Sequence, residues 1–218
     1  MVLAAPVAVL PPLLPLFPLP NVVLFPQVPL PLHIFEPRYR KMVADTLEGH
    51  RAIGMTLLRS ASEEEGRGRP SIYTIGCAGL IERCQPLEGG RYDIVLRGVA
   101  RFRVVEERDG EPYRRGVVEY RGDLMGDRHE LDGLRERVVT ALEREGNEGA
   151  LALAREPLPH DVFVNVLCHG LELAVVEKQS LLDCDSVRDR YLQLLEILHF
   201  RQLERTWGGR GDGDPTVH

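Results

Sequence analysis

Hydrophobic and polar positions change their spacing once along the chain, near residue 122. Before that point, apolar residues form short runs or alternate with polar ones, as is typical of β-strands. After it, they recur every three or four residues, which predicts amphipathic helices; the first stripe is Leu131, Leu134, Val138, Ala141 and Leu142. The pattern predicts an α+β protein with a β-rich unit over residues 13–122 and a helical unit over 123–207.

Strands and one helix are predicted in the first 60 residues. Extended segments at 13–17 and 28–32 precede a helix that begins at Pro37, because proline is favoured at the first helical position. Gly49 can end this helix. A further strand is expected over residues 52–58.

The rest of the β-rich unit predicts strands joined by tight turns. Gly89-Gly90 and Asp109-Gly110 are typical of hairpins. Gly76 and Gly79 predict a bulge or a close backbone approach, and Gly98 is expected to interrupt a strand. We expect a curled antiparallel sheet, to which the N-terminal segments add strands.

The helices of the second unit are predicted from their apolar stripes and end signals. Ser186 with Asp189 three residues later resembles a capping box, so the last helix is expected to begin there and run to about Trp207. Before it we expect four helical segments, which end near Gly146, span 147–154, end at Gly170 and span 177–182. The termini, 1–12 and 208–218, are expected to be flexible.

The chain begins with a long uncharged segment, since its first acidic or basic residue is Glu36. Ten of the 16 prolines fall within the first 37 residues, and proline breaks the continuous helix that a membrane span needs. A signal peptide would begin with basic residues, and residues 1–14 contain none. The four cysteines form no CxxC pair, so we expect buried, reduced thiols, no metal site and a cytoplasmic protein.

The charge balance disfavours nucleic acid as a partner. The formal net charge is −6, whereas phosphate binding needs a basic surface. Arg97, Arg101 and Arg103 around Phe102 faintly resemble an RNA-binding strand, but simple alternation favours a solvent-facing strand surface. RNA binding remains the less favoured alternative.

A search for catalytic motifs finds none. The sequence has no GxxxxGK[ST] phosphate loop, no GxSxG nucleophile elbow and no HExxH zinc motif. Lys178 and Ser180 lie two residues apart, so on a helix their side chains diverge and do not form a Ser-Lys dyad. We predict no catalytic residue, metal or cofactor, and an enzyme with an unmatched site is the remaining alternative.

Four motifs resemble the N-terminal domain of Lon protease. LPLFPLPNVVLFPQVPLPLHIFEPRY at 14–39 is similar to the proline-bracketed start of that domain. IGCAGLIERC at 75–84, YDIVLRGVARFRV at 92–104 and EKQSLLDCDSVRDRYLQLL at 177–195 follow in the family's order. The resemblance covers roughly residues 13–205.

This resemblance implies a PUA-like pseudo-barrel followed by a C-terminal helical bundle. In full-length Lon the region contacts protein substrates and helps assembly, while the ATPase and Ser-Lys peptidase modules lie downstream. Because this sequence ends at His218, the resemblance implies a stand-alone, non-enzymatic module that binds exposed or unfolded polypeptide segments. The alternative is an adaptor that docks onto one fixed protein partner, as a similar domain does in cereblon.

Aromatic and arginine side chains are the usual anchors of such binding. The candidate binding residues are Phe25, His33, Phe35, Arg38 and Tyr39. Alternatively, both phenylalanines belong to the core, and Arg38 with Glu36 only fixes the start of the helix. The expected partners are protein or peptide segments, with no membrane, and the sequence leaves the oligomeric state open.

Overall fold

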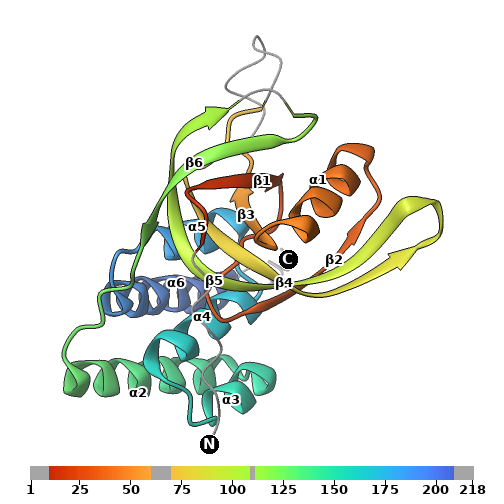
Figure 1. Cartoon of the computed structure of the whole chain (residues 1–218). Coiled ribbons are helices and arrows are strands. Elements are labelled where there is room, and N and C mark those ends of the chain that lie inside the picture. The colour runs from red at the N-terminus through yellow and green to blue at the C-terminus, as the bar shows by residue number, and fades with distance from the viewer. Residues whose placement is uncertain (1–9, 60–69, 109–110, 209–218) are drawn as a thin grey trace, which may run out of the picture. The chain divides into compact units, whose positions relative to one another are not determined.

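The computed structural model describes residues 10–59, 70–108 and 111–208. The chain divides into two units, Met1–Gly122 and Asp123–His218, which are described separately (Figure 1). The expected turn at Asp109-Gly110 lies outside the described residues, and so do almost all residues of the two termini.

The described residues of the first unit form a mixed six-stranded sheet with one α-helix and a 3-10 turn at Glu88–Gly90 (Figure 1). Its elements are β1 (Leu13–Leu19), β2 (Pro29–Ile34), α1 (Pro37–Glu48), β3 (Ala52–Leu57), β4 (Ile75–Leu87), β5 (Arg91–Arg108) and β6 (Arg114–Arg121). The strand order is β2-β5-β4-β3-β1-β6, and β5 also pairs with β6. This additional pairing closes five strands into a barrel and leaves β2 attached outside it.

The length of β5 makes this closure possible. Its first half pairs with β2 and its second half pairs with β6, while β4 pairs with residues 91–103 on the other edge. Alternate side chains fill the interior, which holds Leu14, Leu16, Ala52, Ile72, Ala78, Phe102 and Val118.

Two expectations about the sheet are wrong. The sheet is not entirely antiparallel, because β1 pairs with β3 in parallel. The connection between them contains β2 and α1, and parallel pairing needs such a long crossover. In addition, β5 continues through Gly98 as one strand of 18 residues.

Gly98 serves a close backbone approach rather than a strand end. A Cβ atom on this residue would lie 2.0 Å from the carbonyl oxygen of Phe25. The Gly98 N–H donates to the Val28 carbonyl at 3.0 Å, and the Gly98 carbonyl accepts from Gln27 N–H at 2.8 Å. The predictions for Gly76 and Gly79 are confirmed, since the register shifts at Gly79 and a Cβ on Gly76 would lie 2.4 Å from a main-chain oxygen.

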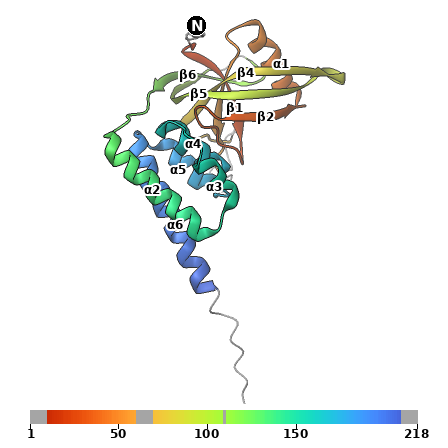
Figure 2. The same ribbon diagram turned by 90° about the horizontal axis from the view of Figure 1, so that it is seen from below.

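The second unit consists of helices. They are α2 (Arg128–Glu145), α3 (Glu148–Ala154), α4 (His160–Gly170), α5 (Val175–Asp183) and α6 (Val187–Gly208). In Figure 2, α2 and α6 run side by side. Their facing sides bury Leu131, Leu134, Val138, Leu142, Tyr191, Leu194 and Leu198.

The end signals of these helices are confirmed. Gly146 ends α2 in the left-handed conformation, with φ of 66°. Before α6, the Ser186 hydroxyl accepts from Asp189 N–H at 2.9 Å. None of the described helices has the length and apolar character needed to cross a bilayer.

The cysteines are less uniform than expected. All four are free, and Cys77 and Cys168 are buried, but Cys84 and Cys184 are partly exposed. The expectation of four buried thiols is therefore wrong for two of them.

Candidate functional site

Strands β2, β5 and β4 place outward-facing side chains in two rows. The register aligns Pro31 with Val95 and Arg83, and it aligns His33 with Asp93 and Gln85. Partners in antiparallel strands point to the same face, so each row crosses the three strands. Together they form a groove of about 420 Å³, lined by Pro31, Leu32, His33, Arg83, Gln85, Asp93, Ile94 and Val95. We call this the strand groove.

The floor of the strand groove is apolar and one rim is cationic. Pro31 and Val95 form the middle, and His33 Nδ1 lies 2.6 Å from Asp93 Oδ1. Arg83 is exposed and has no charged or hydrogen-bonded partner among the described residues. The groove therefore holds one positive charge that no described carboxylate compensates.

An exposed aromatic ring adjoins the groove. Phe35 follows β2 directly and is 61% exposed. Its ring stacks on the ring of His33, with a centroid distance of 6.1 Å and an interplanar angle of 23°. Because His33 also contacts Asp93, the three side chains form one connected end of the groove.

Two of the five candidate binding residues lie in the core. Phe25 is fully buried and Tyr39 is 5% exposed. The Tyr39 ring packs against Phe17 at a centroid distance of 4.3 Å, and burial raises the pKa of its hydroxyl. Direct contact of Phe25 or Tyr39 with a partner is therefore not retained. The core alternative is correct for Phe25 and wrong for Phe35.

Arg38 lies at the surface beside the start of α1. Its Nε donates to Glu36 Oε2 at 2.9 Å, and its guanidinium lies 4.4 Å from the centre of the Tyr39 ring. These contacts hold Arg38 beside Glu36, whose side chain does not cap α1, and they do not place Arg38 in the strand groove.

The sequence profile of the ATP-dependent protease La (Lon) substrate-binding domain matches residues 13–199. The chain belongs to this family. Among curated relatives, Lon protease 2 of Sorangium cellulosum is 30% identical over 200 residues, and Lon protease of Flavobacterium johnsoniae is 26% identical over 199 residues. Each alignment covers 87% of this chain but only 25% and 24% of the relative, so the chain spans about a quarter of their length.

Solved structures of Lon N-terminal domains have the same fold. The Lon N-terminal domain protein from Xanthomonas campestris matches with a TM-score of 0.61 and 28% identity, over 84% of this chain and 97% of that one. The N-terminal domain of Lon protease from the Mycobacterium avium complex matches with a TM-score of 0.65 over 86% of this chain and 98% of that one. At 12% identity, the second match shows the fold alone.

Most groove residues of this Lon substrate-binding domain were missed in the sequence. His33 and Phe35 were candidates, whereas Arg83, Asp93 and Val95 were not. The sequence did contain one signal for Asp93 and Val95. They alternate with the buried residues Ile94 and Leu96, which indicates that they lie on the outer face of the strand. The sequence does not show the cross-strand register that brings these residues beside β2.

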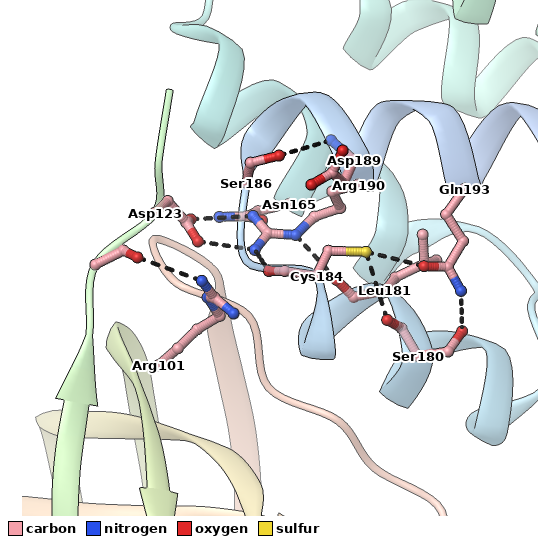
Figure 3. A network of polar contacts seen from close by, with 11 residues as sticks. Arg101, Asp123, Asn165, Ser180, Leu181, Cys184, Ser186, Asp189, Arg190 and Gln193 are labelled. Carbon is pink, nitrogen blue, oxygen red and sulfur yellow. Dashed lines mark hydrogen bonds and ion pairs between the residues drawn. The ribbon is translucent and has the colours of Figure 1, made fainter. Parts of the chain in front are cut away.

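A second candidate is the buried polar network around Arg190 in α6 (Figure 3). Arg190 is 0% exposed, and its two terminal nitrogens donate to the Asp123 carboxylate at 3.0 and 2.9 Å. It also donates to Asn165 Oδ1 at 2.8 Å and to the carbonyls of Leu181 and Cys184 at 3.0 and 3.3 Å.

This network is structural rather than a ligand site. The guanidinium bonds to groups of the protein itself, and its charge is matched by a carboxylate at hydrogen-bond distance. Arg190 thus connects the first residue of the helical unit with α4 and with the turn between α5 and α6.

The catalytic and metal candidates find no support in the geometry. Lys178 Nζ donates to the His169 carbonyl at 2.6 Å, and Ser180 Oγ donates to the Glu177 carbonyl at 2.8 Å, so the two side chains have separate partners. Within the described residues, no three histidine, cysteine or acidic side chains group as metal ligands would.

The basic strand around Phe102 is not a continuous exposed strip. Arg101 is only 1% exposed and donates to the Gly122 carbonyl at 3.4 Å, so the solvent-facing expectation is wrong for this residue. Arg97 forms an ion pair with Glu82, and Phe102 is in the core.

Proposed function

We propose that this Lon substrate-binding domain is a non-enzymatic module that binds exposed or unfolded polypeptide segments through the strand groove and Phe35. The observation that supports this most directly is the exposed Phe35 ring at the end of a groove built on three paired strands. The description of the family as substrate-binding supports protein segments as the ligand.

The construction of the groove favours binding with little loss of entropy. Its side chains come from neighbouring strands, and the ring of Phe35 is held by His33, which is held by Asp93. A preformed surface avoids much of the ordering cost that weakens binding. An exposed aromatic beside polar side chains is a common anchor of protein interfaces. The sequence holds no phosphate-binding loop or nucleophile elbow, which supports a role without catalysis.

The test is fluorescence anisotropy of labelled, chemically unfolded casein titrated with the protein in the absence of ATP. Saturable binding is expected for the unfolded chain, and none for a folded protein or for RNA. Phe35→Ala should weaken binding by about tenfold, since truncated hot spots cost about 1–2 kcal/mol or more. Tyr39→Ala is unsuitable as a test because the ring is buried, and its loss would destabilise the fold.

Phe200→Ala is the matched control. Phe200 lies on α6 and is 65% exposed, so the same truncation is made at a similar exposure outside the groove. An unchanged affinity in Phe35→Ala, or equal losses in both variants, would show that the groove is not the site. If unfolded casein does not bind even at tens of micromolar, general recognition is refuted, and a pull-down for one dedicated partner becomes the next experiment.

A further inference from the structure

The alternation of hydrogen bonds along β2 determines which of its residues direct main-chain groups to the outer edge. Within the described sheet, β2 pairs only with β5. Gly98 N–H donates to the Val28 carbonyl, and in an antiparallel pair the residues that bond to the partner alternate with those that point away. Residues 30, 32 and 34 therefore bond to β5, and residues 29, 31 and 33 direct their main-chain groups outward.

Two of these three outward positions are prolines. Pro29 and Pro31 have no N–H, so between residues 29 and 33 only His33 offers a donor along the outer edge. A peptide that adds a strand to a sheet needs donors and acceptors in alternation. Prolines on an edge strand remove this template and protect the edge against further pairing. Recognition at β2 must then use side chains.

The side chains of the groove indicate which types of residue a bound segment would carry. Phe35 at one end, with Pro31 and Val95 on the floor, offers apolar contact surface. Arg83 at the opposite rim offers the cation that lacks a described counter-charge. Among the other polar groups nearby, His33 contacts Asp93, Arg97 forms an ion pair with Glu82, and Arg91 donates to the Glu88 carbonyl.

The spacing of these two features follows from the register. Phe35 lies four residues along β2 from Pro31, and Arg83 lies two strands across from Pro31. With about 3.3 Å per residue along a strand and about 4.8 Å between strands, the two positions are roughly 16 Å apart. An extended segment spans that distance with about five residues.

We infer that the strand groove selects segments in which an aromatic or large apolar residue and a carboxylate are four or five residues apart, and that it binds them without strand addition. This inference rests on the proposed function and names the class of segment recognised. The apolar side chain packs on Phe35 and Pro31, and the carboxylate meets Arg83.

The test uses labelled twelve-residue peptides in a Ser-Gly background at low ionic strength, because salt screens exposed charges. One peptide carries Phe with Asp five residues later, and in two others Asn or Lys replaces the Asp. The Phe–Asp peptide should bind about two- to fivefold more tightly than the Phe–Asn peptide, and the Phe–Lys peptide should bind most weakly. Arg83→Glu should reverse the order of the Asp and Lys peptides.

Two controls separate this inference from nonspecific charge effects and from strand addition. Arg103→Glu makes the same charge change at an exposed β5 position outside the groove and should leave the peptide order unchanged. A Phe–Asp peptide with N-methyl groups at alternate amides should bind within about twofold of the parent, whereas strand addition would lose much more.

The experiments distinguish a failure of this inference from a failure of the proposed function. If unfolded casein binds in a Phe35-dependent manner but Arg83→Glu does not change the peptide order, the charge selectivity is refuted and the proposed function stands. A large loss on N-methylation refutes side-chain recognition alone. If neither casein nor any peptide binds, the proposed function fails and this inference fails with it.

Discussion

Replacement of Asp123 by alanine should leave the guanidinium of Arg190 buried without its counter-charge. Arg190 is 0% exposed and the Asp123 side chain is 14% exposed, so water can restore little of the lost interaction. The bonds to Asn165 Oδ1 and to two main-chain carbonyls remain, but these acceptors are neutral. Removing one partner of a buried ion pair costs about 3–5 kcal/mol.

The partial exposure of Asp123 favours the lower end of this range, about 3 kcal/mol. For a unit of fewer than 100 residues, each kcal/mol lowers the melting temperature by about 4–8 °C. Asp123→Ala should therefore lower the melting temperature of the helical unit by roughly 12–24 °C. Far-ultraviolet circular dichroism follows this transition, because the second unit contains most of the helix. The curve should be fitted with separate transitions for the two units, since a single two-state fit need not apply to such a chain.

Glu130→Ala provides the matched control. Glu130 also pairs with an arginine of α6, Arg188, but both side chains are about 40% exposed. An exposed pair contributes about 0–1 kcal/mol, so the control should lose at most a few degrees. Equal losses in the two variants would refute the reasoning about the buried network. If Asp123→Ala does not fold, Asp123→Asn, which keeps one acceptor oxygen, should fold with an intermediate loss.

Two further predictions concern the packing of single residues. Gly98→Ala should destabilise the first unit by about 1–3 kcal/mol or more, because its Cβ would meet a main-chain oxygen. This loss should lower the urea midpoint of unfolding. Gly122→Ala is the control, since its Cβ has open space around it and should change the urea midpoint little. Burial raises the pKa of the Cys168 thiol to about 12, so the folded state keeps a proton that the unfolded state releases above about pH 9. Between these pH values the free energy of unfolding should fall with rising pH, by at most about 1.4 kcal/mol per pH unit from this group. The urea midpoint of Cys168→Ala should therefore fall less steeply with pH than that of the unchanged protein.

Features set by local chemistry were predictable from the sequence. Pro37 begins α1, Gly146 ends α2 and Ser186 caps α6, because each acts on backbone groups within a few residues. The continuity of β5 through Gly98 was not predictable in this way. It depends on the backbone around Phe25, more than 70 residues earlier in the chain.

The binding groove and the buried network depend on contacts between distant segments. His33 and Phe35 stood out because both belong to the quoted N-terminal motif, but Arg83 joins them only through the pairing of β4 with β5 and β5 with β2. Arg190 was not among the residues singled out in the sequence. Its position three residues after Val187 and four before Leu194, both buried, marked it as part of the inward face of α6.

The closed barrel also affects how the chain folds as it is synthesised. Strand β1 pairs with β3 on one side and with β6 on the other, and β6 ends at Arg121. A ribosome must therefore add roughly 100 residues after β1 before the barrel can close, which takes about 5–20 s at typical elongation rates. During that interval the apolar β1 segment lacks one of its neighbours, and Pro15 and Pro18 within it limit the pairing it can make with other nascent chains.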